Sequence, residues 1–170
     1  MSRVDFTWLP DGHDGLGELA IAIDGEPLPE ILRRVEEPFT SQPGELAKPG
    51  GYSGIVGWRF DRSVTDHFEG GVDSHMASGP HDKTVLASCE CGEVGCWPLM
   101  ASVSLHESAV VWRNFENPHR TERSGAGGRR ASGIWNYGEL SFTFDRAQYM
   151  ESLRAADAAI RAWRNERGSG

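Results

Sequence analysis

Three cysteines lie within eight residues of one another, and thiols so closely spaced can bind a metal ion or react with each other. Cys89 and Cys91 are separated by one residue, so in a strand they would share a face, about 6.5–7 Å apart along the backbone. Gly92 and Gly95 permit the tight return that would bring Cys96 back toward them. Three thiolates converging in one hairpin loop would supply most of a tetrahedral zinc shell.

A fourth ligand is needed to complete this shell, and two histidines lie near the expected hairpin. His119 directly follows the third strand of an expected meander, and this strand runs back toward the cysteine end. His106 lies in the preceding turn, at the far end of that hairpin. We therefore predict zinc as the cofactor, held by the three cysteines and His119. The C-x-C-x4-C spacing itself matches no standard structural zinc motif.

Two other interpretations of the cysteines stay open. They can be buried thiols that pack as small apolar side chains in a tight loop. They can also form a reversible disulfide, between Cys91 and Cys96 or between Cys89 and Cys96, whereas a bond within C-x-C would be strained. Reversible oxidation or exchangeable metal binding would make the protein a thiol redox sensor or a metal sensor.

A cysteine-dependent enzyme is a further alternative. His119 would be the base, with Glu116 or Glu93 to orient it and the backbone amide of Gly92 or Gly95 to stabilise an oxyanion. The carboxylates inside the loop oppose this role, because they raise the pKa of a nearby thiol. The sequence also lacks the phosphate-loop, nucleophile-elbow, zincin and EF-hand motifs. Whether the protein is an enzyme stays open, and a non-enzymatic role is favoured.

The charge of the chain limits its partners. The formal net charge is −8, which disfavours nucleic acid and anionic membranes as partners. Residues 1–112 carry a net charge of −11 and residues 113–170 carry +3, so the two parts are expected to attract each other in the fold. An acidic surface of this kind is suited to a basic protein partner, as in an inhibitor or immunity role.

The chain of 170 residues is long enough for one domain with its own core, so we expect a single domain over residues 1–170. The first residues lack the apolar stretch of a signal peptide, and no apolar run is long enough to cross a membrane. The odd number of cysteines does not fit a secreted disulfide framework. A soluble protein of the reducing cytoplasm is expected, and its oligomeric state is not predicted.

The first half of the chain predicts two strands and one short helix. Residues 6–10 have strand composition, and residues 18–23 alternate large apolar side chains with smaller or polar ones. Asp24-Gly25 is a turn dipeptide. A short helix is expected over residues 30–35, with Pro29 suited to its first turn. Residues 40–84 form a loop-rich segment broken by several Pro-Gly and Gly-Gly pairs.

The second half predicts a sheet followed by a helix. Three strands, 85–89, 96–105 and 109–115, form an antiparallel meander, and 138–144 is a last strand. Asp145 and Gln148 have the spacing of a capping box. The helix behind them carries an apolar stripe of Tyr149, Leu153, Ala156, Ile160 and Trp163. On its other face Asp157 and Arg161 form an i,i+4 pair, and the tail 165–170 is expected to fray.

These elements define an α+β fold. It consists of a mainly antiparallel β-sheet with a central meander, a C-terminal amphipathic helix packed on the sheet, and one short N-terminal helix.

Several segments together resemble a group of uncharacterised bacterial proteins. They are Leu19 to Leu28 (LAIAIDGEPL), Gly51 to Gly54 (GYSG), Cys89 to Leu99 (CECGEVGCWPL), Asn117 to Arg120 (NPHR) and Phe144 to Tyr149 (FDRAQY). The group is similar in its C-x-C-G-x-x-G-C-W-P-L core, its P-H-R tripeptide and its final strand and helix. The resemblance implies a single domain and directs attention to Cys89, Cys91, Cys96, Trp97, His119 and Arg120. It implies no established activity, cofactor or partner.

The function that the sequence favours is a small acidic binding module whose three-cysteine loop holds a structural zinc ion. A redox or metal sensor using the same cysteines, and a cysteine-dependent enzyme, are the alternatives.

Overall fold

The computed structural model of the chain describes residues 1–39, 48–57, 60, 63–69, 83–91, 95–121 and 134–168. Much of the predicted loop-rich segment 40–84 lies outside the described residues, and so do Gly92 and Glu93. The elements in chain order are β1 (Val4–Leu9), α1 (Gly12–Gly15), β2 (Glu18–Ile23), β3 (Glu26–Pro27), α2 (Leu28–Glu36), η1 (Glu37–Phe39), β4 (Tyr52–Ser53), β5 (Ile55–Val56), α3 (Val64–Phe68), β6 (Thr84–Cys89), β7 (Leu99–Leu105), β8 (Ala109–Thr121), β9 (Ile134–Asn136), β10 (Phe142–Asp145) and α4 (Arg146–Gly168).

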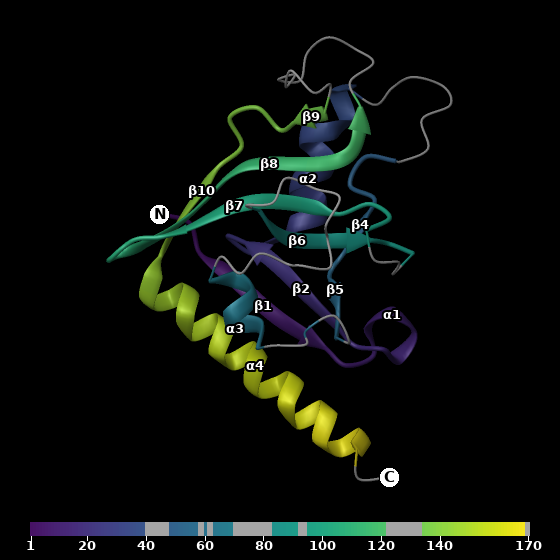
Figure 1. Ribbon diagram of the computed structural model, residues 1–170, viewed down its shortest axis with the longest axis vertical. Helices are drawn as coiled ribbons and strands as arrows, with labels where there is room; N and C mark the ends of the chain where they lie inside the picture. Colours follow the sequence, from purple (N-terminus) through teal and green to yellow (C-terminus); the bar gives the residue numbers. More distant parts are fainter. Residues whose placement is uncertain are drawn as a thin grey trace.

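The strands form two sheets, and α4 runs along the outer side of the smaller one (Figure 1). In the smaller sheet β2 pairs with β1 on one side and with β3 and β5 on the other. The larger sheet has the order β10-β8-β7-β6-β4, with β9 also paired to β8. All these strand pairs are antiparallel. The predicted α+β class, with a mainly antiparallel sheet and a packed C-terminal helix, is confirmed.

The chain crosses from the larger sheet to the smaller one at Gly54, between β4 and β5. A Cβ atom at this position would lie 2.2 Å from the carbonyl oxygen of Leu19, so only glycine fits there without moving β2. The Gly54 amide also donates a hydrogen bond to Glu18 Oε1 at 2.6 Å. This crossing brings β4, which borders the cysteine loop, next to the edge of β2.

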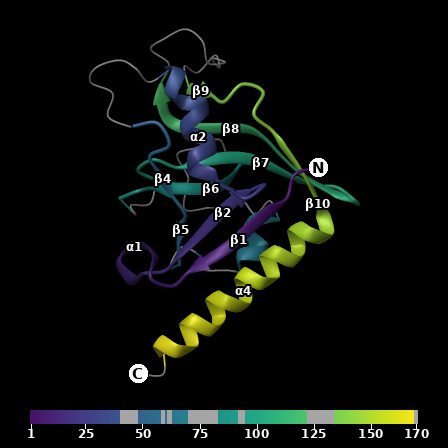
Figure 2. The same ribbon diagram turned by 180° about the vertical axis from the view of Figure 1, so that it is seen from behind.

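The smaller sheet and α2 follow the sequence pattern closely. Leu19, Ile21 and Ile23 are buried on β2, as their alternation predicts. The turn residues Asp24 and Gly25 both have positive φ, 51° and 82°, as a tight hairpin with the right-handed twist requires. α2 begins two residues earlier than predicted, and it extends from the β2–β3 hairpin toward the β9 end of the larger sheet (Figures 1 and 2).

The meander is present, but two of its boundaries differ from the prediction. β7 begins at Leu99 and not at Cys96, because the residues before Pro98 form the turn that closes the cysteine loop. β8 continues past Phe115 to Thr121. The register against β7 shifts near Asn114, which has a φ of 54°, and such a bulge lets the strand bend and continue. The Asn-Pro-His-Arg segment therefore lies on a strand.

α4 begins at the predicted cap and covers the free edge of β1. Asp145 Oδ1 accepts a hydrogen bond from the Gln148 amide at 2.9 Å, which is the first half of the capping box. The Gln148 side chain instead bonds both backbone groups of Val4, at 3.2 and 2.6 Å. Ser152 Oγ accepts from the Phe6 amide at 2.8 Å. Gln148 and Ser152 thus form hydrogen bonds with backbone groups of β1 that a neighbouring strand would otherwise make.

The predicted pair of Asp157 and Arg161 on the solvent face of α4 is wrong for Asp157. Its carboxylate is buried and accepts hydrogen bonds from the Val64 amide at 2.7 Å and from Thr65 Oγ1 at 2.5 Å. The cause is α3, which packs on α4 and turns its N-terminal amide groups toward that side. An acidic residue near a helix N-terminus satisfies amides that have no partner within the helix.

The core is continuous between the two sheets and α4. Trp112, Phe144 and Tyr149 pack in it with rings 4.9–6.0 Å apart, and the predicted stripe of α4 is buried except for the half-buried Trp163. α4 continues to Gly168, and the fraying of the tail stays a prediction. Within the described residues, no helix combines the length and apolar character that crossing a membrane would require.

Candidate metal centre

The three cysteines converge as predicted. The sulfur atoms of Cys89, Cys91 and Cys96 all lie within 4.8 Å of one another, and those of Cys89 and Cys91 are 2.9 Å apart. Cys89 ends β6 and is half-buried, whereas Cys91 and Cys96 are exposed on the turn that leads to β7. The interpretation that the three thiols are buried packing groups is therefore wrong, because two of the three side chains face solvent.

The pKa of the Cys89 thiol is raised to about 12. The main cause is burial, which disfavours the thiolate, and the neighbouring Cys91 thiol adds to it. In the metal-free protein Cys89 is therefore a protonated thiol at neutral pH. A bound metal cation would reverse this preference, because a coordinating thiol loses its proton.

The start of the cysteine loop is held by β4. Cys89 pairs with Tyr52 and Ser88 pairs with Ser53 in the short β4–β6 ladder. Ser53 Oγ donates a hydrogen bond to the Cys89 carbonyl at 3.0 Å. These bonds fix the backbone of the first ligand, while its sulfur stays directed toward the other two cysteines.

The end of the loop is held by His119. Its Nε2 lies 2.6 Å from the Gly95 carbonyl oxygen, and its ring stacks on Trp97 with ring centres 6.4 Å apart. These two contacts flank Cys96 on both sides. His119 does not belong to the group of ligand atoms within 4.8 Å, so the structure places it beside the three sulfurs and not among them.

The contact with Gly95 determines which ring nitrogen of His119 is available. A carbonyl oxygen only accepts hydrogen bonds, so Nε2 must carry the proton and donate it. In the neutral ring Nδ1 then has the free lone pair. Metal-binding histidines commonly donate their second N–H to a carbonyl or carboxylate in this way, which fixes the ring and its tautomer.

A buried chain of polar side chains lies behind these anchors, and we call it the tyrosine–glutamate chain. It consists of Glu36, Tyr137, Tyr52 and Asn117, which are all buried. Tyr137 Oη is 2.6 Å from both Glu36 Oε1 and Tyr52 Oη, and Tyr52 Oη is 3.0 Å from Glu36 Oε1. Each tyrosine hydroxyl has one proton to donate, so the two hydroxyls can donate in only two of these three contacts. The two shorter contacts assign the donors: Tyr52 donates to Tyr137, and Tyr137 donates to Glu36.

Asn117 connects this chain to His119. Its Nδ2 donates to Tyr52 Oη at 3.0 Å, and its Oδ1 accepts from the His119 amide at 2.9 Å. Burial raises the pKa of Tyr137 well above its usual value, and the neighbouring Tyr52 and Glu36 add to this rise. The chain therefore fixes Tyr52, which pairs with Cys89, and His119, which contacts the residue before Cys96, through one set of buried bonds.

The sequence analysis missed the tyrosine–glutamate chain as part of the site. One signal was present for Glu36, which lies four residues after Leu32 and thus on the apolar stripe of α2. A carboxylate on an apolar stripe indicates a buried polar contact. Tyr52 and Tyr137 carry no comparable signal, because a tyrosine in a core position is common.

Among the residues that the structure describes, those predicted for catalysis do not have the arrangement that a cysteine enzyme needs. Glu116, a predicted partner of His119, is buried and bonds Lys83 Nζ at 2.5 Å. Glu93 and Gly92 lie outside the described residues. His119 itself contacts the Gly95 carbonyl, so this carbonyl points at the imidazole. The arrangement fits a structural role of His119 better than that of a general base.

Comparison of the chain with protein-family models, with curated proteins and with solved structures gives no match. The resemblance to the uncharacterised bacterial group stays a hypothesis.

Proposed function

We propose that the protein is a small binding module whose three-cysteine loop holds one structural zinc ion. The single observation that carries this proposal is the convergence of three sulfurs within 4.8 Å at the end of the β6–β7 hairpin. Three thiolates and one further ligand form a common structural zinc shell. For the fourth ligand we propose His119 through Nδ1, in agreement with its tautomer.

The sulfur positions need only a small adjustment to hold zinc. Zinc–sulfur bonds of about 2.3 Å in a tetrahedron place the sulfurs about 3.8 Å from one another. The 2.9 Å between Cys89 and Cys91 is shorter than this, and the 4.8 Å limit for the whole group is longer. Because Cys91 and Cys96 are exposed, rotation of their side chains meets little resistance from the core.

Cobalt substitution tests the proposal, because tetrahedral Co²⁺ reports on its ligands by absorption. We expect one Co²⁺ per chain, with sulfur-to-metal charge-transfer bands, and displacement of Co²⁺ by Zn²⁺. Single substitutions of Cys89, Cys91 and Cys96 by serine should each reduce the charge-transfer intensity. His119→Ala should shift the ligand-field bands and leave the sulfur bands in place.

The matched control is Ser104→Ala, a half-buried hydroxyl on β7 that is not among the predicted ligands. It should bind Co²⁺ as the unmodified chain does. Absence of sulfur-to-metal bands in the unmodified chain would contradict the zinc proposal. Unchanged ligand-field bands in His119→Ala would remove His119 from the shell and leave a three-sulfur site with a water molecule.

A second candidate is thiol redox sensing, and the sulfur of Cys96 favours it, because this sulfur lies within 4.8 Å of those of Cys89 and Cys91. Oxidation by hydrogen peroxide would remove two hydrogens from two thiols and yield one disulfide and two water molecules. The raised pKa of Cys89 makes it a slow attacking group, so an exposed cysteine would react first. Mass spectrometry after peroxide treatment would show a loss of two hydrogens, and an unchanged mass would reject this candidate.

We propose a basic protein as the partner of the module, because the net charge is −8 and residues 1–112 carry most of the acidic excess. Such an association should weaken steeply as the salt concentration rises. Binding to an immobilised lysine-rich peptide at low salt, with loss at high salt, would support this partner class. Equal retention on a matched acidic peptide would contradict it.

A further inference from the structure

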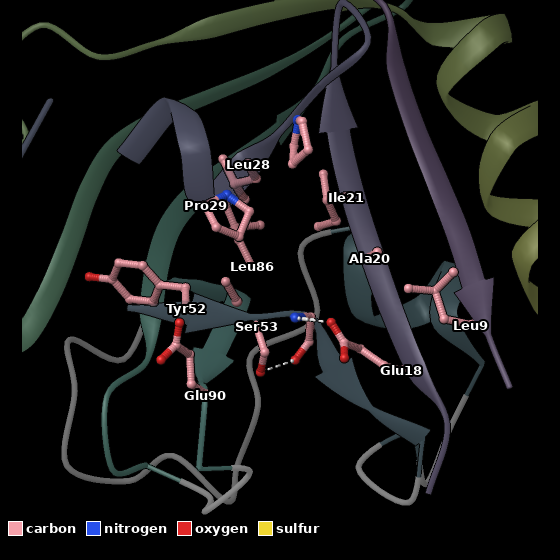
Figure 3. A pocket seen from close by; sticks show the side chains of 13 residues that line it. Leu9, Glu18, Ala20, Ile21, Leu28, Pro29, Tyr52, Ser53, Leu86 and Glu90 are labelled. Carbon is pink, nitrogen blue, oxygen red and sulfur yellow. Dashed lines mark hydrogen bonds between the residues drawn. The ribbon is translucent and has the colours of Figure 1, made fainter. Parts of the chain in front are cut away.

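A cavity of about 470 Å³ lies where the two sheets meet, between β2, α2 and the β4–β6 pair (Figure 3). Its cause is a gap in the smaller sheet. β2 pairs with β5 at Leu19 and with β3 at Ala22, and the stretch Ala20–Ile21 between these pairings lines the cavity. The volume lies within the range of small-molecule sites in proteins.

The two ends of the cavity differ in polarity. Leu28, Pro29 and Leu86 gather at one end, whereas Glu18 and Glu90 lie toward the other, on opposite walls (Figure 3). Among the described residues that line the cavity there is no lysine, arginine or histidine. The site is therefore amphipathic, and its formal charge is negative.

Glu18 is the residue that points to a cationic ligand. Its side chain is only 16% exposed, so its carboxylate has lost most of its contact with water. Oε1 accepts from the Gly54 amide, but Oε2 is 3.9 Å from His13 Nδ1, which is beyond hydrogen-bond distance. A largely buried carboxylate is stabilised by a cation or by further donors, and a ligand can supply them.

Glu90 adds a second carboxylate on the opposite wall of the cavity. It pairs with Lys48 at 2.9 Å, and the two side chains are 48% and 68% exposed. A surface ion pair of this kind contributes little to stability. An anionic ligand would meet two carboxylates, whereas an ammonium group brings a full positive charge and three donors to Glu18.

We propose that this cavity is a binding site for a small organic amine, whose ammonium group pairs with Glu18 and whose apolar body packs against Leu28 and Pro29. Glu18 and the apolar end of the site lie outside the cysteine loop, whereas Glu90 stands between Cys89 and Cys91 in the sequence. The site adds a small-molecule ligand class to the proposed binding module.

The test uses 2-phenylethylamine as the probe in an NMR titration of the full chain. Saturable shifts are expected at the backbone amides of Gly54 and Ala20. 2-Phenylethanol has the same body without the charge, and it should bind about tenfold more weakly, because a hydrogen bond to a charged group is stronger than a neutral one. Equal binding of the amine and the alcohol would overturn the proposal.

Two variants and one control make the test specific. Glu18→Gln keeps an acceptor for the Gly54 amide but removes the charge, so binding should weaken about tenfold. Ala20→Leu fills the cavity and should abolish binding. Glu30→Gln removes a carboxylate that pairs with Arg33 on the exposed side of α2, and it should bind as the unmodified chain does. Unchanged binding in Ala20→Leu would overturn the cavity as the site.

A lysine side chain of a partner protein offers the same ammonium chemistry. N-acetyl-lysine amide is therefore titrated in parallel. Weaker binding of this compound than of 2-phenylethylamine supports a free small amine. Tighter binding would overturn the small-molecule proposal in favour of a partner's side chain.

Discussion

The contact between α3 and α4 and the cysteine end of the meander are both organised by polar side chains, but in opposite ways. At the first, Asp157 is buried and its oxygens accept hydrogen bonds from Val64 and Thr65. At the second, the sulfurs of Cys89, Cys91 and Cys96 are directed at one another, and two of them face solvent. At the α3–α4 contact the polar groups form hydrogen bonds with one another. At the cysteine end the three sulfurs are placed so that they can bind an added metal ion.

This difference indicates what each region does. A carboxylate with satisfied oxygens stabilises the fold and has little left to offer a ligand. Three converging thiols stabilise little by themselves, because two of them are exposed and contribute little to the core. The tyrosine–glutamate chain lies between these extremes, since it is buried and satisfied but supports the anchors of the cysteine loop.

The largest effect on stability is expected from Asp157→Ala. It removes the acceptor of three hydrogen bonds at the start of α3, so the free energy of unfolding should fall by about 3 kcal/mol. Urea denaturation followed by tryptophan fluorescence measures this change. The zinc affinity of the folded protein should stay unchanged, and a loss of zinc affinity equal to that of a cysteine variant would contradict the separation of the two regions.

The next effect is the stabilisation by zinc. At a free zinc concentration one hundred times the Kd, binding to the folded state alone adds about 2.7 kcal/mol. Cys91→Ser should remove this gain but change the stability of the metal-free protein by less than about 0.5 kcal/mol, because Cys91 is exposed. Thermal melts with and without a chelator measure both quantities. A melting temperature indifferent to the chelator would contradict a structural ion.

Tyr52→Phe should affect both stability and metal binding. The change removes a buried hydroxyl that accepts from Asn117, so stability should fall by about 1.5 kcal/mol. The zinc affinity should also fall several-fold, because Tyr52 pairs with Cys89 and Asn117 holds the His119 backbone. Competition with a chromophoric chelator measures the affinity. If only stability falls, the tyrosine–glutamate chain is a core feature without influence on the loop.

A further expected effect is a pH dependence of zinc binding. In the folded metal-free protein the pKa of Cys89 is raised from about 9 to about 12, so the thiol keeps its proton at neutral pH. Metal-free stability should fall as pH rises from about 9 toward 12, since the unfolded thiol ionises first. In the zinc-bound protein Cys89 is a thiolate, so zinc binding releases its proton. The zinc affinity should therefore rise by at least about tenfold per pH unit between pH 6 and 8. A flat profile would exclude Cys89 as a ligand.

The elements with a strong local pattern were predictable. β2, the Asp24-Gly25 turn and α4 follow from alternation, turn chemistry and a capping residue, and the convergence of the cysteines followed from the hairpin between β6 and β7. The extension of β8 was not predictable, because Pro118 argues against a strand and the bulge at Asn114 has no clear sequence signal.

The burial of Asp157 and the tyrosine–glutamate chain depends on contacts distant in sequence. Asp157 forms a hydrogen bond with Thr65, which lies 92 residues away along the chain, and Tyr137 forms one with Glu36, which lies 101 residues away. A helical pattern tells which face of α4 is apolar, but it does not tell that α3 covers the neighbouring polar position. The local sequence therefore indicated the sulfur ligands, whereas the residues that hold them in place required the tertiary structure.

The side chains of Gln148 and Ser152 cover the edge of β1. Because they lie near the end of the chain, they are synthesised later than the strand that they cover. Val4 and Gln148 are 144 residues apart, so β1 leaves the ribosome about 7 to 30 seconds before its cover is made. During that interval its outer amide and carbonyl groups are open to another chain. Nascent copies on one messenger would be most prone to pair through β1, and completion of α4 ends that exposure.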